Sequence, residues 1–142
     1  MTARHFKELV AWQLANEFKS EAFRLLRGSR EAWANYKFRD QAIESARSVA
    51  ANVVEGFLRK SPGDFCRFLD YSVSSLGETE GHIRDGIELS YFSPGSCTQF
   101  FRLGRRCLTA LIRLKQSQQR YIRELHDRRH EKAKRPQKDL EP

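Results

Sequence analysis

Arginine residues at helical spacing are the clearest chemical feature of this chain. Four of them would lie within about 40° of one another on an α-helix, which turns about 100° per residue, and two more would flank the row. They are Arg102, Arg106, Arg113 and Arg120, flanked by Arg105 and Arg123. Guanidinium groups form paired, charge-assisted hydrogen bonds to phosphate oxygens, so the row suits a nucleic-acid backbone. A solvated helix face opposite a core would show the same pattern, and the sequence leaves both interpretations open.

The overall charge favours the nucleic-acid interpretation. Lysine and arginine number 26 against 18 aspartate and glutamate, which gives a net charge of +8. A charge of that sign indicates polyanionic partners, namely RNA, DNA or an acidic membrane. No apolar run approaches the length that spans a bilayer, so we expect RNA or DNA as the partner and no membrane.

Residues that could catalyse a reaction or hold a metal form no familiar pattern. The phosphate-binding, zinc-protease and serine-hydrolase motifs are all absent. His126 and His130 stand four residues apart and could share a helix face. No third ligand lies near them in the sequence, which favours an exposed pair without a metal. We therefore expect no enzymatic activity, no cofactor and no metal site.

The cysteines indicate a reducing compartment. Cys66, Cys97 and Cys107 are odd in number and lack C-x-x-C spacing, which argues against a disulfide-stapled secreted domain. Cys66 and Cys107 lie near apolar positions and are expected to pack as small hydrophobic residues. No signal peptide is recognisable after Met1, so we expect a cytoplasmic protein.

Four amphipathic stretches must position these residues. Apolar side chains recur at helical spacing over residues 8–27, 38–58, 61–91 and 96–126. Ser61 is a suitable helix cap, and Pro62 suits the first position of the helix that follows. No stretch alternates with a period of two, so no sheet is expected. Four long helices with short links predict an all-α, antiparallel, up-down-up-down four-helix bundle over residues 1–127.

The last fifteen residues differ in composition from the rest of the chain. Residues 128–142 are basic and almost free of apolar side chains, which predicts a frayed helix end and a mobile tail. Arg128 and Arg129 begin this tail and join the candidate nucleic-acid contacts.

Polar residues cluster in the middle of the second and third predicted helices. Facing helices that carry such residues can satisfy one another's hydrogen bonds and fix their register. A ligand or nucleotide pocket is the alternative, and we favour the structural interpretation. The residues expected to pair between helices are Ser48, Asn52, Glu55, Ser75 and Glu78.

Several motifs in this order resemble a known family. They are Phe6-x-x-Leu9-x-x-Trp12-Gln13, Ser48-x-x-x-Asn52-Val53-Val54-Glu55-Gly56, Asp64-Phe65-x-Arg67-Phe68-Leu69 and Ser75-Leu76-x-Glu78. The chain resembles the bacterial four-helix bundle proteins first known as products of intervening sequences in large-subunit ribosomal RNA genes. The resemblance implies a ring, commonly a homopentamer. It also implies kinship with accessory proteins of diversity-generating retroelements, which work with a reverse transcriptase.

Two functions follow as expectations. The first is a non-enzymatic, homo-oligomeric protein that binds ribosomal RNA or another structured RNA. The second is a scaffold oligomer that acts through a protein partner, for example a retroelement reverse transcriptase. Aromatic residues beyond a single core stripe would supply apolar surface for self-association: Trp12, Phe57, Phe92 and Phe101.

Overall fold

The structure is a computed structural model that describes residues 3–135, and all of its regular elements are helices. No strand occurs within this range, so the predicted all-α class is confirmed. The five α-helices are α1 (Val10–Gly28), α2 (Arg30–Ala34), α3 (Tyr36–Leu58), α4 (Pro62–Glu88) and α5 (Thr98–Lys134). Two single turns of 3-10 helix, η1 (Phe6–Glu8) and η2 (Gly95–Cys97), precede α1 and α5.

Polar side chains start three of the helices. The Ser61 side chain accepts a hydrogen bond from the backbone N–H of Asp64, and Pro62 is the first residue of α4, as the sequence indicated. Asn35 caps α3 in the same way. Ser29 caps α2, a short helix in the link between the first two stretches that the sequence predicted.

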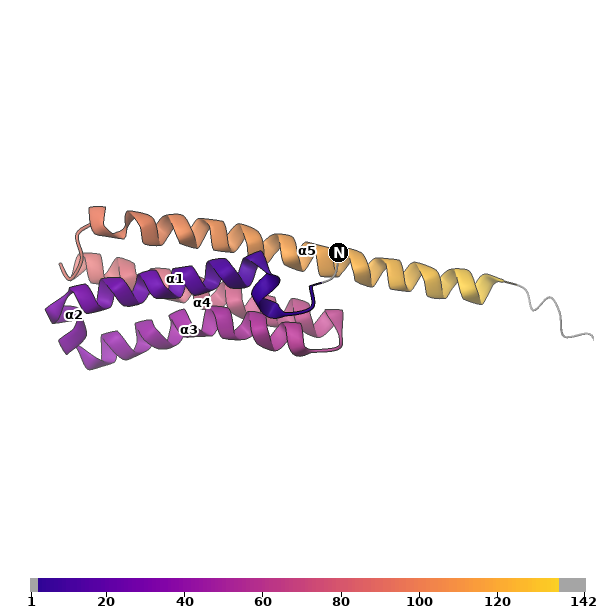
Figure 1. Cartoon of the computed structure of the whole chain (residues 1–142), viewed down its shortest axis with the longest axis horizontal. Helices are drawn as coiled ribbons and strands as arrows, with labels where there is room; N and C mark the ends of the chain where they lie inside the picture. Colours follow the sequence, from indigo (N-terminus) through magenta and orange to yellow (C-terminus); the bar gives the residue numbers. More distant parts are fainter. Residues whose placement is uncertain (1–2, 136–142) are drawn as a thin grey trace, which may run out of the picture.

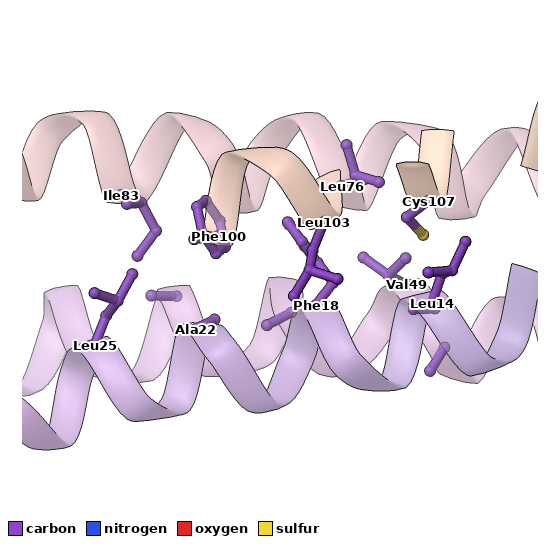
Figure 2. Packing of buried hydrophobic residues seen from close by; sticks show 14 of the residues in the cluster. Leu14, Phe18, Ala22, Leu25, Val49, Leu76, Ile83, Phe100, Leu103 and Cys107 are labelled. Atoms are coloured by element: carbon purple, nitrogen blue, oxygen red, sulfur yellow. The ribbon is translucent and has the colours of Figure 1, made fainter. Parts of the chain in front are cut away.

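The four long helices lie side by side around one core (Figure 1). α1 and α4 each pack against both α3 and α5. Figure 2 shows the centre of this core, where the Phe18 and Phe100 rings stack with their centroids 4.7 Å apart. Both rings are fully buried, and burying an aromatic side chain stabilises the fold by about 2–3 kcal/mol. We call these packed parts of α1, α3, α4 and α5 the helical body.

Aromatic residues expected to remain for self-association belong to the core of the single chain. Phe92 is buried, and Trp12, Phe57 and Phe101 are half-buried against the core. They pack beside the central stripe, where neighbouring helices meet. A single apolar stripe on each helix, which the sequence predicts, would leave these residues exposed. The exposed large apolar side chains are instead Val10, Leu58, Leu89 and Ile112, together with several tyrosines and others.

Helix α5 continues far beyond its neighbours (Figure 1). Its 37 residues would span about 55 Å, and its last buried residue is Leu111. Ile122 and Leu125 continue the core-facing stripe in sequence, but α1 and α4 have ended there, so Ile122 is exposed. Residues 128–134, expected to begin the tail, are helical, and residues 136–142 lie outside the described part of the chain.

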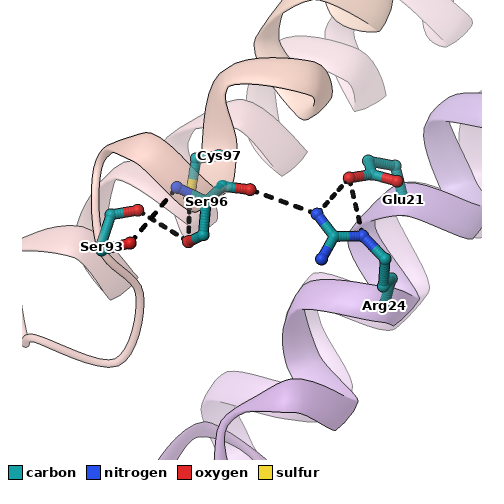
Figure 3. A network of polar contacts seen from close by, with 5 residues as sticks. All are labelled: Glu21, Arg24, Ser93, Ser96 and Cys97. Carbon is teal, nitrogen blue, oxygen red and sulfur yellow. Dashed lines mark hydrogen bonds and ion pairs between the residues drawn. The ribbon is translucent and has the colours of Figure 1, made fainter.

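Two polar contacts tie α5 and its connector to the rest. Before the helix starts, the Arg24 guanidinium of α1 donates to the Ser96 carbonyl at 3.2 Å and also contacts Glu21 (Figure 3). Further along, Lys115 Nζ lies 2.7 Å from Asp70 Oδ1 of α4. This hydrogen bond favours the charged form and raises the pKa of Lys115 above its ordinary value.

Hydroxyl groups connect α3 to α4 along their contact, in what we call the hydroxyl ladder. Ser48 Oγ and Ser75 Oγ are 2.9 Å apart, and the fully buried Ser72 donates to the Val49 carbonyl at 2.8 Å. Thr79 Oγ1 lies 2.9 Å from Ser45 Oγ and 2.7 Å from the Ser75 carbonyl. The expected pairing between helices is therefore present at Ser48 and Ser75.

Three other polar residues do not pair between helices. Asn52 donates to the carbonyl and hydroxyl of Ser48 in its own helix. Glu55 pairs with Arg59, and Glu78 faces His82 at 3.6 Å, both along one helix and both exposed. Only one side of α3 and one side of α4 lie in the contact between the two helices, and Glu55 and Glu78 lie outside that contact.

Replacing Thr79 by Val should destabilise the fold by about 1–3 kcal/mol, because its shape is kept while buried polar partners lose their hydrogen bond. Thr109→Val is the matched control, since Thr109 is exposed and bonds only within α5. The control should change stability by less than about 0.5 kcal/mol. Urea unfolding followed by circular dichroism measures both, and equal effects would contradict a structural role for the hydroxyl ladder.

Two glycines of α4 should respond in opposite directions to alanine. A Cβ at Gly86 would stand 2.6 Å from Phe92 Cδ2 and 3.1 Å from Phe38 Cζ, whereas Gly77 has open space. Gly86→Ala should cost about 1–3 kcal/mol through overpacking. Gly77→Ala should add about 0.5–1 kcal/mol, because alanine favours a helix over glycine. Thermal unfolding of both variants measures the difference, and a stabilised Gly86→Ala protein would contradict the close contact.

Candidate nucleic-acid interface

All eight arginines indicated by the sequence lie on α5 with exposed side chains. The row faces away from the stripe formed by Phe100, Cys107 and Leu111, which is buried. From its first to its last member the row would extend about 27 Å along the helix. The eight residues are Arg102, Arg105, Arg106, Arg113, Arg120, Arg123, Arg128 and Arg129.

The first two thirds of α5 carry positive charge only. Residues 98–123 contain seven basic residues and no acidic one. Among the described residues, no ion pair involves any of the eight arginines. In contrast, Arg67 and Arg84 each pair with a carboxylate of α4, and Arg59, the residue after α3, pairs with Glu55. The row therefore presents guanidinium groups that no carboxylate neutralises.

The charge pattern changes after Arg123. Glu124, Asp127 and Glu131 follow within the next two turns, on the same side of α5 as the row. Arg128 and Arg129 lie on other sides of the helix, so they do not extend the row. The continuous basic face thus runs from Arg102 to Arg123.

The buried side of α5 holds this face in place. Gly104 brings the helix close to its neighbours, because a Cβ there would stand 2.8 Å from Glu80 Oε1 and 3.3 Å from Phe18. Cys107 is fully buried, and burial raises the pKa of its thiol to about 12. A thiol with that pKa stays protonated at neutral pH and packs as a small hydrophobic group.

A groove between α1 and α5 adjoins the row. It has a volume of about 610 Å³. Its apolar lining comes from Leu9, Val10 and Leu14 near the start of α1 and from Ala110 and Leu114 of α5. Three arginines of the basic face also line it: Arg105, Arg106 and Arg113. Sequence reasoning missed the groove because its two sides are about 100 residues apart in the chain.

The central polar residues lie at a different hollow. Ser48, Asn52 and Glu55 line an open depression of about 1,020 Å³ on α3, beside η1 and α1. Its lining carries three carboxylates, from Asp40, Glu44 and Glu55, against two basic side chains, Lys19 and Arg47. The depression therefore has no excess of positive charge to attract phosphate, and the basic face of α5 remains the candidate nucleic-acid interface.

Metal-ligand clusters and membrane-spanning helices are two further features to consider in the described residues. No group of three or more potential metal ligands gathers within residues 3–135. No helix in the described range is both long enough and apolar enough to cross a membrane.

Comparison with known families places this geometry in context. The family model of the 23S rRNA-intervening sequence proteins matches residues 7–113, from η1 to the middle of α5. None of the curated proteins compared with the chain matches it. The matched segment covers the helical body and more than half of the chain, while the projecting part of α5 lies beyond it. The chain therefore belongs to the 23S rRNA-intervening sequence protein family.

Proposed function

We propose that this chain is a non-enzymatic, homo-oligomeric, cytoplasmic protein that binds ribosomal or other structured RNA. One observation carries the proposal: residues 98–123 present six exposed arginines and no acidic residue, on a helix whose opposite face is buried as far as Leu111. A fixed row of unpaired guanidinium groups provides charge-assisted hydrogen bonds to phosphate oxygens. Each neutralised phosphate also releases condensed counterions, which drives binding.

The row suits the backbone of a nucleic acid better than its bases. No aromatic side chain alternates with Arg102, Arg106, Arg113 and Arg120, and only Tyr121 lies near their end. Stacking on aromatic rings is the usual way in which proteins hold unpaired bases. Binding through this face should therefore depend on phosphate number and backbone shape more than on base sequence.

We further propose that α1, α3, α4 and α5 alternate in direction as an antiparallel up-down-up-down bundle and that the bundles assemble into a ring. The family resemblance favours five subunits. Exposed apolar side chains support self-association, since Val10 is 61% exposed and Leu58 is 67% exposed. A ring repeats the arginine row around its axis, and repetition raises avidity without a new kind of contact.

The groove between α1 and α5 favours a second function. An apolar floor beside Arg105, Arg106 and Arg113 fits an amphipathic helix that carries carboxylates. In this function the chain is a scaffold oligomer that acts through a protein partner, for example a reverse transcriptase. The same arginines would then contact acidic side chains in place of phosphate.

Replacing Arg106, Arg113 and Arg120 together with Gln should weaken RNA binding and leave the fold intact. Loss of three phosphate contacts should reduce the slope of log affinity against log salt by about 2–3. The loss should be similar for unrelated RNA sequences, because phosphate contacts carry no sequence information. Filter binding of the variant and the unchanged protein across a salt series measures both effects.

A second triple variant distinguishes the effect of the arginine row on RNA binding from the effect of the total charge. Arg27, Arg30 and Arg47 are exposed, lie on other helices and form no ion pair among the described residues. Changing these three to Gln removes the same charge and should affect the salt slope much less. Equal losses in both variants would mean that charge alone attracts the RNA. No binding by the unchanged protein, even at low salt, would favour the scaffold function.

Light scattering tests the proposed assembly. At micromolar concentration the protein should show a mass several times the 16.6 kDa of one chain. Leu58→Asp places a charge on an exposed apolar position outside the core and should reduce the mass only if Leu58 lies in the subunit contact. A monomer at all concentrations would contradict the proposed ring.

A further inference from the structure

Two histidines face each other on the projecting part of α5. The Nε2 atoms of His126 and His130 are 3.1 Å apart, and the two ring centroids are 4.3 Å apart. Both side chains are exposed, and both lie after Leu111, the last buried residue of α5. They also lie outside the segment that matches the family. No part of the proposed RNA contact uses them.

The separation of the two Nε2 atoms is the separation that a single metal ion requires. Zinc binds imidazole nitrogen at about 2.0–2.1 Å, so two such ligands at a tetrahedral angle lie about 3.3 Å apart. Two neighbouring ligands of a square-planar or octahedral ion lie about 2.9 Å apart at the same bond length. The observed 3.1 Å, at which the two nitrogens share a hydrogen bond, falls between these values, so an ion could replace the shared proton with little change in the separation of the two nitrogens.

A carboxylate lies near the other nitrogen of one ring. Asp127 Oδ1 is 3.8 Å from His126 Nδ1. At that distance the carboxylate is not hydrogen-bonded to the ring and acts only through its negative charge, which attracts a cation. Within four residues of the pair, five basic side chains oppose a cation, and three carboxylates, Glu124, Asp127 and Glu131, attract one. Because positive charge is in excess, the site requires an ion with strong affinity for nitrogen. Calcium and magnesium prefer oxygen ligands and do not meet this requirement.

We propose that His126 and His130 chelate one divalent transition-metal ion of the zinc, nickel and copper group through their Nε2 atoms. One chain supplies two ligands, and water or the same pair of a second copy completes the coordination. The chelate closes one turn of α5 at a place where no other helix packs against it. Bound metal therefore stabilises this turn, since a ligand that binds only the helical form shifts the equilibrium toward it.

Titration of the untagged, full-length protein with Ni²⁺ by calorimetry tests the proposal. Nickel is the probe because it favours imidazole over the half-buried thiol of Cys66. The unchanged protein should bind one ion per chain, or one ion per two chains if two pairs share it. His126→Gln should lower the affinity by about tenfold or more, at least as much as the loss of an outer-shell partner costs.

A swap of two residues provides the matched control. Arg128→His combined with His130→Arg keeps composition and charge but places the histidines two residues apart, on opposite sides of the helix. This double variant should bind Ni²⁺ as weakly as His126→Gln, and circular dichroism should show that both remain as helical as the unchanged protein. If the swapped protein or His126→Gln binds Ni²⁺ as tightly as the unchanged chain, the histidine pair is not the site.

Discussion

The burial of one stripe of α5 between α1 and α4 determines how the rest of this molecule is presented. Phe100, Leu103, Cys107 and Leu111 form that stripe, and the stacked rings of Phe18 and Phe100 lie at its centre. A helix that buries one stripe must expose the opposite one, and on α5 the opposite stripe carries the arginines. Core packing therefore fixes the direction in which the basic face points.

Specific contacts between the other helices fix their positions relative to one another. α3 and α4 are joined by the hydroxyl ladder and by close approaches at Gly56 and Gly86, where a Cβ would contact phenylalanine rings. Buried hydroxyl pairs have only a few positions in which both partners are satisfied, so they restrict sliding between the two helices. α4 in turn packs against α5, and the ion pair of Asp70 with Lys115 adds a polar contact between them.

Local patterns predicted the helices well because each signal acts within a few residues. Ser61 and Pro62 began α4 as expected, and the arginine row required only the period of a helix. The errors came from the surroundings of each helix. Ile122 continues the apolar spacing of the core, but its exposure depends on where α1 and α4 end. Glu55 and Glu78 belong to the polar clusters in the sequence, but each pairs along the chain and neither takes part in the contact between α3 and α4.

The basic face and the groove share Arg105, Arg106 and Arg113, so an RNA and a protein helix would compete for them. The two modes differ in physical origin. Phosphate binding through released counterions weakens steeply with salt, whereas burial of Val10 and Leu14 under a partner does not depend on counterions. A partner that fills the groove would therefore displace RNA most easily at high ionic strength. At low ionic strength the row Arg102 to Arg120 would favour the proposed RNA partner, because two of its members, Arg102 and Arg120, lie outside the groove and would be available to phosphate alone.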